Sequence, residues 1–229
     1  MIGVLVPAHN EAEHLDACLR SLAFAAAHPG LCGEAVCIVV ALDACDDSSA
    51  AICHRHGVAT VELQARCVGA ARAAAANELI GRGARWLACT DADSQVPAQW
   101  LLAQRDAGTD VFCGVVDLDE RVPQHSWLRS CFQRGERWGD GHGRVHGANL
   151  GVSTRAYQAA GGFAAQRCSE DVDLVRRLHA QGASIRWAGA PMVITSARLA
   201  GRASGGFADH LATLAGSMAE AQPGLALAT

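Results

Sequence analysis

The sequence predicts an α/β protein with a mostly parallel sheet and helices on its faces. From residue 2 to residue 118, short apolar runs alternate with segments in which apolar residues recur at helical spacing, a pattern typical of this class. The 229 residues are half hydrophobic, and no linker rich in proline, glycine or serine divides them, so the chain can bury one sizeable core. We therefore expect a single domain over residues 1–229, with a regular half at 1–118 and a less regular half at 119–229.

The regular half contains the strands and helices in alternation. Acidic residues near a first helical turn, or a proline within it, indicate where the helices start. Because open sheets of this kind bind ligands at the carboxyl ends of their strands, the loops at 7–11, 42–48 and 90–95 should lie along one edge. The expected strands are residues 2–6, 35–42, 58–63, 85–90 and 110–118, and the helices begin after Asn10, after Ser48, near residue 68 and at Pro97.

The second half is less regular. Ser169 can cap a helix whose first turn carries Glu170 and Asp171 and which Gly182 ends. The expected elements that complete the chain are a last strand near Met192–Thr195 and a terminal helix over about 207–221.

Composition excludes several classes of function. The net charge of −4, with arginines scattered among acids, leaves no basic face for a nucleic acid. No apolar run approaches the roughly 18 residues of a membrane span, and the amino terminus lacks the basic region of a signal peptide. We expect a cytoplasmic protein without a transmembrane segment, and peripheral membrane contact stays open.

Lysine and cysteine usage narrows the chemistry. The chain contains no lysine, which excludes Schiff-base chemistry and a P-loop lysine. Its ten cysteines are dispersed through apolar segments without any Cys-x-x-Cys pair, so we expect buried free thiols.

Two aspartates, Asp91 and Asp93, follow the apolar run Trp86–Cys89. If the strand continues through them, alternation points both carboxylates the same way and turns Ala92 toward the core. Magnesium and manganese prefer hard oxygen ligands and keep coordination positions for water and phosphates, so this pair suits a metal–nucleotide site. The alternative is that the acids only cap the strand or the following helix.

Four short motifs occur in order along the chain: Val4-Leu5-Val6-Pro7-Ala8-His9-Asn10-Glu11, Thr90-Asp91-Ala92-Asp93-Ser94, Gly161-Gly162-Phe163 and Ser169-Glu170-Asp171-Val172-Asp173-Leu174. Together they resemble the family 2 glycosyltransferases, which have the Rossmann-like GT-A fold of nucleotide-diphospho-sugar transferases. The resemblance spans roughly residues 2–196. It implies transfer of a sugar from a nucleotide-diphosphate donor to an acceptor hydroxyl with inversion, with the donor bound by residues 1–118 and the acceptor and catalysis served by 119–229.

The resemblance implies roles for individual residues. Asp93 would hold a divalent metal, Mn²⁺ or Mg²⁺, that stabilises the charge on the departing diphosphate. Asp171 would be the general base for the acceptor hydroxyl, with Glu170 positioning the acceptor. The helix macrodipole alone also favours two acids in a first helical turn, so Glu170 and Asp171 could be purely structural. The presence of Asp91 and Asp93 favours the catalytic interpretation. The implied nucleotide-sugar contacts are Pro7, Asn10, Glu11, Asp43, Arg72 and Asp91, and the implied acceptor contact is Asn149.

The chain departs from the family at the end of the second strand. The family often has two adjacent acids followed by Gly-Ser, whereas this chain reads Leu42-Asp43-Ala44-Cys45. The usual base-contacting position therefore falls on Leu42, with Asp43 as the nearest candidate, and both uridine and guanosine stay open. Neither His146 nor His210 is assigned to the metal, because a lone histidine is more often structural.

Competing interpretations remain. A sugar nucleotidyltransferase shares the α/β core but typically has a Gly-rich, basic loop after its first strand, and a non-catalytic nucleotide-sugar-binding module would keep the fold without turnover. A Rossmann dehydrogenase is disfavoured because no Gly-x-Gly-x-x-Gly follows the first strand. The acceptor and the oligomeric state stay open. The polar segment 119–144, with Trp127 and Trp138, either shapes an acceptor pocket or packs its tryptophans against the sheet, and we expect packing for at least one of them.

Overall fold

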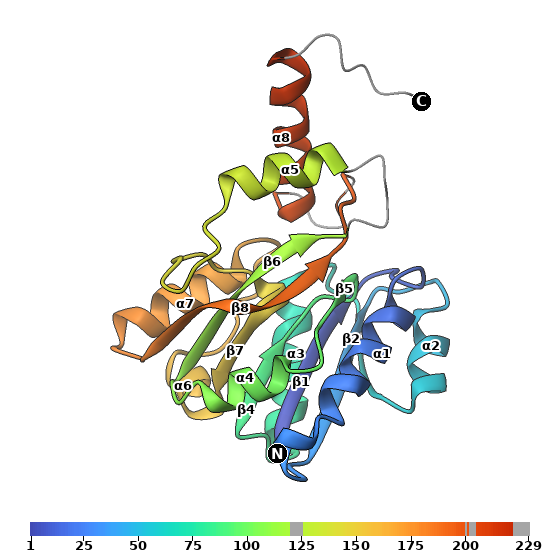
Figure 1. The fold of residues 1–229 in the computed structure, drawn as a ribbon. Helices are drawn as coiled ribbons and strands as arrows, with labels where there is room; N and C mark the ends of the chain where they lie inside the picture. The colour runs from blue at the N-terminus through green and yellow to red at the C-terminus, as the bar shows by residue number, and fades with distance from the viewer. Residues whose placement is uncertain (120–125, 200, 202–204, 222–229) are drawn as a thin grey trace.

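One mixed sheet organises the molecule. The computed structural model describes residues 1–119, 126–199, 201 and 205–221 (Figure 1). Residues 120–125 and 222–229 of the predicted acceptor half lie outside the described residues. Among the described residues an eight-stranded sheet has the order β3-β2-β1-β4-β7-β6-β8-β5, and it is continuous from the first half of the chain into the second.

The first four long strands are parallel. β1 lies between β2 and β4, with Ile2 opposite both Val36 and Trp86. β1, β2 and β4 are apolar runs because helices cover both faces of this part of the sheet, whereas β3 at the edge alternates, with Thr60 and Glu62 exposed. The predictions of strands at 2–6, 35–42, 58–63 and 85–90 are confirmed. The observed bounds are β1 Ile2–Ala8, β2 Val36–Asp43, β3 Ala59–Leu63 and β4 Trp86–Cys89.

An antiparallel strand separates this half from the rest of the sheet. β7 (Leu150–Ser153) pairs antiparallel with both β4 and β6 (Val111–Leu118). β8 (Ile185–Thr195) then runs parallel to β6, and the short β5 (Ser94–Gln95) pairs antiparallel with β8. The predicted strand at 110–118 is confirmed, whereas β7 was not predicted and β8 begins before the predicted Met192–Thr195. Four residues of strand after a 3₁₀ turn (Gly147–Asn149) give too short an apolar run to stand out.

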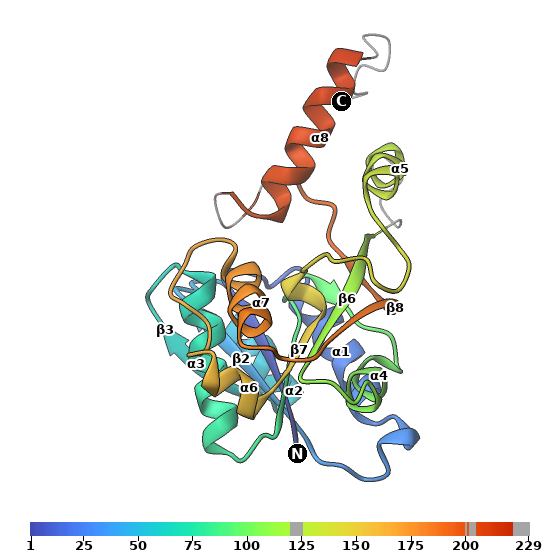
Figure 2. The ribbon, with the colours of Figure 1, turned by 90° about the vertical axis from the view of Figure 1, so that its left-hand side faces the viewer.

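Helices cover the two faces of the sheet and bury a separate core on each (Figures 1 and 2). Alternation along β1 sends Val4 and Val6 to one core and Leu5 to the other. The first core packs α1 (Leu15–Ala26), α2 (Ser49–His56) and α4 (Trp100–Asp106), and the second packs α3 (Val68–Gly81), α6 (Thr154–Ala159) and α7 (Glu170–Ala180).

Helices α5 (Ser126–Gly135) and α8 (Phe207–Ala221) contact each other beyond the carboxyl end of the sheet (Figure 2). The Phe132 and Phe207 rings meet edge to face with centroids 5.5 Å apart. The predicted terminal helix at 207–221 is therefore confirmed. None of the described helices combines the length and apolar character needed to cross a membrane.

Several helix starts differ from the predicted ones. α1 begins at Leu15 rather than just after Asn10, because Asn10 has φ of 54° and the next residues form a turn in which His14 donates to the Glu11 carbonyl. α4 begins at Trp100, after a turn that the Trp100 N–H closes onto the Pro97 carbonyl. α7 begins where predicted, but Ser169 has φ of 61° and its side chain does not cap the helix.

The cysteines are all free, as predicted. Burial holds only for Cys18, Cys53, Cys89, Cys113 and Cys131.

Candidate active site

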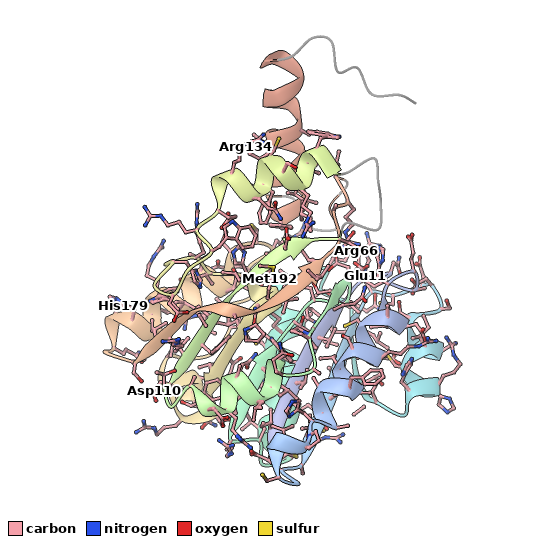
Figure 3. The ribbon with its side chains drawn as sticks, viewed as in Figure 1. Glu11, Arg66, Asp110, Arg134, His179 and Met192 are labelled. Atoms are coloured by element: carbon pink, nitrogen blue, oxygen red, sulfur yellow. The ribbon has the colours of Figure 1, made fainter. Side chains whose placement is uncertain are left out.

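A cavity of about 680 Å³ opens at the carboxyl edge of the parallel strands. The loops that follow β1 and β4 line it, as expected for an open sheet, with Asp43 at the end of β2 and the residues just before α3. The starts of α3, α7 and α8 and the end of β8 complete the lining. Figure 3 shows Glu11 and Arg66 at this edge and Asp110 at the opposite end of the sheet. The structure thus brings first-half and second-half residues to one site.

Asp91 and Asp93 both line the cavity, but they lie in a turn. β4 ends at Cys89, and the Ser94 N–H donates to the Asp91 carbonyl at 3.1 Å. The expected continuation of the strand through these acids is therefore wrong, because a turn rather than strand alternation orients them. Ala92 is buried, as expected. Burial raises the pKa of Asp93 to about 6.

Arg72 joins Asp91 to the acids of α7. Its Nη2 lies 2.6 Å from Asp91 Oδ1, and its Nη1 lies 2.5 Å from Glu170 Oε1. The guanidinium is buried and stacks over the Phe163 ring at 5.8 Å. Burial lowers the Arg72 pKa, but Asp91 and Glu170 outweigh burial and hold that pKa above its ordinary value. Arg72 therefore fixes two of the predicted site residues relative to each other.

Glu170 and Asp171 start α7, and each takes a different environment. Glu170 is buried against Arg72, and burial raises its pKa although Arg72 opposes the shift. Asp171 is partly exposed and lines the cavity, and among the described residues its Oδ1 accepts a hydrogen bond from the Val172 N–H at 2.8 Å. Two adjacent acids are thus held differently: Glu170 is fixed by an ion pair, and Asp171 faces the cavity.

Glu11 and Asp93 share Arg198, which sequence reasoning missed. Arg198 donates to both Glu11 oxygens at 2.9 and 2.8 Å, and its Nη2 lies 3.0 Å from Asp93 Oδ2. No local motif marks Arg198. The available signal is its position, three residues after the last strand and therefore at the carboxyl edge of the sheet.

The side chains of Asp43 and Asn10 form hydrogen bonds that fix neighbouring loops. The buried Asp43 carboxylate accepts backbone hydrogen bonds at 2.7–2.8 Å from Ala65, Arg66 and Cys67, which precede α3. Asp43 still borders the cavity, as does Pro7. Asn10 is not among the lining residues, because its amide exchanges hydrogen bonds with Asp46 at 2.6 and 2.9 Å. Asn10 therefore joins two loops, and the predicted nucleotide contact does not follow from its placement.

Asn149 does not reach the cavity. It is fully buried, accepts from Trp100 Nε1 at 2.9 Å and donates to the carbonyls of Val115 and Pro191 at 2.8 and 2.9 Å. Its predicted contact with the acceptor is therefore not supported, because these bonds use the amide to join α4 to β6 and β8.

The second-half wall of the cavity carries histidines and an aromatic ring. His146, Phe207 and His210 line it, with the His146 and Phe207 rings edge to face at 6.5 Å. Burial lowers the pKa of His146 to about 4, so its imidazole is neutral at pH 7. Trp127 and Trp138 pack against the first core rather than lining the cavity, as expected for at least one of them.

The residues present suit a metal that the substrate helps to coordinate. Among the described residues no group of three or more histidine, cysteine or acidic side chains is placed to hold a metal ion. The cavity offers Asp93, with Asp91 nearby but paired to Arg72. One or two carboxylates completed by water and phosphate oxygens is a usual arrangement for Mg²⁺ and Mn²⁺. The donor set therefore fits such an ion, although Arg198 contacts the same Asp93 carboxylate.

Comparison with known proteins decides the family. The sequence profile of glycosyl transferase family 2 matches residues 3–164. The chain belongs to this family. No curated protein sequence matches it.

Solved structures of glycosyltransferases share the GT-A fold of this family 2 member. S. aureus TarS residues 1–349 in complex with UDP-GlcNAc aligns with TM-score 0.66 and 16% identity, covering 89% of this chain and 60% of that one. The mannosyltransferase PcManGT from Pyrobaculum calidifontis, with GDP-Man and Mn²⁺, aligns with TM-score 0.58 and 18% identity over 84% and 56%. GalNAc-T7 with UDP, GalNAc and Mn²⁺ aligns with TM-score 0.61 and 13% identity over 86% and 44%. The chain thus spans at most 60% of the length of these structures.

Proposed function

We propose that this protein transfers a sugar from a nucleotide-diphosphate donor to an acceptor hydroxyl with inversion at the anomeric carbon. The observation that carries the proposal is that Asp91, Asp93, Glu170 and Asp171 all line one cavity. The nucleotide sugars bound to TarS and PcManGT, which share the fold, support a donor of this class.

The donor side of the site supplies cations and one metal ligand. Arg66 and Arg167 line the cavity, and among the described residues neither forms an ion pair, so both are available to the donor diphosphate. Asp93 would hold Mn²⁺ or Mg²⁺, which when bound supplies Lewis-acid stabilisation of the leaving diphosphate. Mn²⁺ accompanies the nucleotide in PcManGT and GalNAc-T7, which supports this choice of ion.

The acceptor side of the site supplies the base. Asp171 takes the proton from the acceptor hydroxyl as that oxygen attacks the anomeric carbon and the bond from that carbon to the diphosphate breaks. Attack from the face opposite the leaving diphosphate gives inversion. Glu170, fixed by Arg72, holds the start of α7 and therefore the position of Asp171. Arg72 also touches Asp91, so the donor and acceptor walls are connected through one side chain.

The test is nucleotide release from a panel of UDP- and GDP-sugars, measured with candidate sugar and lipid-phosphate acceptors. The wild type should release one of the two nucleotides in a metal-dependent reaction. Asp171→Asn should still bind that nucleotide while release falls by about 10²-fold or more. Unchanged release by Asp171→Asn would remove Asp171 from the role of base, and tight donor binding without any turnover would favour the non-catalytic module.

A further inference from the structure

Arg198 forms a three-point contact between two acids of the cavity. Its guanidinium fork meets both oxygens of Glu11 at 2.9 and 2.8 Å, and the same Nη2 lies 3.0 Å from Asp93 Oδ2. Glu11 and the Asp93 side chain are 5% and 11% exposed. Glu11 follows β1, Asp93 follows β4 and Arg198 follows β8, so this contact joins three strand ends at the edge of the sheet.

The contact neutralises the negative charge of the Glu11 and Asp93 carboxylates, which would otherwise destabilise the fold. Two carboxylates brought close together out of water destabilise the fold unless a cation compensates them. The partly buried Arg198 supplies that cation, because Arg72, the buried arginine of the cavity, pairs with Asp91 and Glu170. Among the residues that the structure describes, the second oxygen of Asp93 has only long contacts, at 3.4 Å, with the hydroxyls of Ser94 and Thr195.

A divalent cation and Arg198 would compete for the same carboxylate. An ion held by Asp93 would have to contact one of its carboxylate oxygens directly, while the guanidinium is already 3.0 Å from Oδ2. Two positive groups so close in a largely buried cavity repel each other strongly, since little water separates them.

We propose that Arg198 and the divalent cation are alternative partners of Asp93, so that Arg198 sets the metal affinity of the site. This inference rests on the metal ligand of the proposed function. On metal binding, Arg198 leaves Asp93 but keeps its two bonds to Glu11. Its Nη2 then faces the cavity, where the donor diphosphate is available as its new partner. Arg198 is thus a positioning residue that couples metal entry to donor binding.

The test measures Mn²⁺ affinity without nucleotide, by calorimetry or by the electron paramagnetic resonance signal of free Mn²⁺. Arg198→Gln removes the competitor and should tighten Mn²⁺ binding about tenfold or more. Arg66→Gln removes another arginine of the same cavity, one with no carboxylate partner in the described part of the chain, and it should change the affinity by less than about threefold. Adding Asp93→Asn to Arg198→Gln should abolish the gain.

A second measurement uses the unaltered protein. Saturating Mn²⁺ should speed hydrogen exchange of the amides of residues 196–199, because the contact of Arg198 with Asp93 is lost. This readout stands even if Arg198→Gln fails to fold.

Three results would overturn the inference. Mn²⁺ affinity that is equal or weaker in Arg198→Gln, or unchanged exchange at 196–199 in the wild type, would mean that the arginine and the metal coexist. Absence of Mn²⁺ binding in both folded proteins would remove the metal from Asp93. In each case, titration with UDP and GDP in chelator shows separately whether donor binding survives.

Discussion

Arg72 and Glu170 lie 98 positions apart in the sequence and meet as a buried ion pair, with Nη1 2.5 Å from Oε1. The same guanidinium holds Asp91 at 2.6 Å. This contact makes α3 the link between the turn that follows β4 and the helix that starts with the proposed base.

Arg72→Met should destabilise the fold by about 3–5 kcal/mol, because it leaves Glu170 buried without a counter-charge. Adding Glu170→Gln should recover part of this loss. The free energy of unfolding, from denaturant titration, measures both. As a control, Arg82→Met removes an exposed pair with Glu78 and should cost no more than about 1 kcal/mol. Equal losses in the two single variants would contradict the assigned importance of the buried pair.

Asn149→Leu should lower the free energy of unfolding by about 2–4 kcal/mol, since it leaves Trp100 Nε1 and two buried carbonyls without the hydrogen bonds that Asn149 makes to them. Nucleotide affinity of the folded fraction should not change, because the side chain lies outside the cavity. A stable variant with a raised KM for the acceptor would instead restore Asn149 as an acceptor contact.

Gly69→Ala should destabilise the protein by more than about 2 kcal/mol. A Cβ at Gly69 would lie 2.1 Å from the Ala164 carbonyl oxygen, where α3 starts against the loop before α7, and the Gly69 N–H also donates to Gln166. Gly81→Ala, at the end of the same helix, meets nothing within 4 Å and should stabilise by up to about 1 kcal/mol. Thermal unfolding of the two variants provides a matched comparison, and similar shifts would contradict the close approach.

The buried His146 should make the free energy of unfolding fall at acid pH. Burial, with the positive charges of His142, Arg144 and His210, lowers its folded pKa to about 4, while Asp91 opposes the shift and Glu136 lies 3.9 Å away. The unfolded chain, with a histidine pKa of about 6.5, therefore binds more protons between these values. The contribution to stability is fully present above pH 6.5 and falls as the pH drops toward 4.

His146→Gln should remove about 2 kcal/mol of that acid-dependent loss, measured as the difference in unfolding free energy between pH 7 and pH 4.5. His179→Gln, on an exposed part of α7, should leave the difference as in the wild type. If the free energy of unfolding of His146→Gln fell between pH 7 and pH 4.5 as much as that of the wild type, protonation of His146 would not cause the acid-dependent loss.

The parallel half of the fold could be predicted because its signal is local. Strands such as β1 and β2 are apolar runs, and their buried residues make them visible without any partner. The first part of β8 was missed since its exposed Arg186 and its Gly189 interrupt the apolar pattern, although pairing with β6 keeps the strand extended. Pairing is a tertiary effect that no window of sequence contains.

The carboxylates of the site could be predicted from the sequence, but their pairing with particular arginines could not. Asp91, Asp93, Glu170 and Asp171 all line the cavity. The cations that hold these acids were not predictable as partners, because the ion pairs of Arg72 and Arg198 join residues far apart in sequence. The buried position of Asn149 could not be predicted, since a turn asparagine that faces a ligand and one that hydrogen-bonds buried backbone have the same local sequence.

The most direct measurement is calorimetric titration of the wild type and Asp93→Asn with UDP and GDP, each with Mn²⁺ and with chelator. The proposed function predicts that one nucleotide binds the wild type with Mn²⁺, and that chelator or Asp93→Asn weakens this binding about tenfold or more. Failure of both nucleotides to bind the folded wild type would contradict the nucleotide-sugar site, and binding that is indifferent to chelator and to Asp93→Asn would contradict the metal within it.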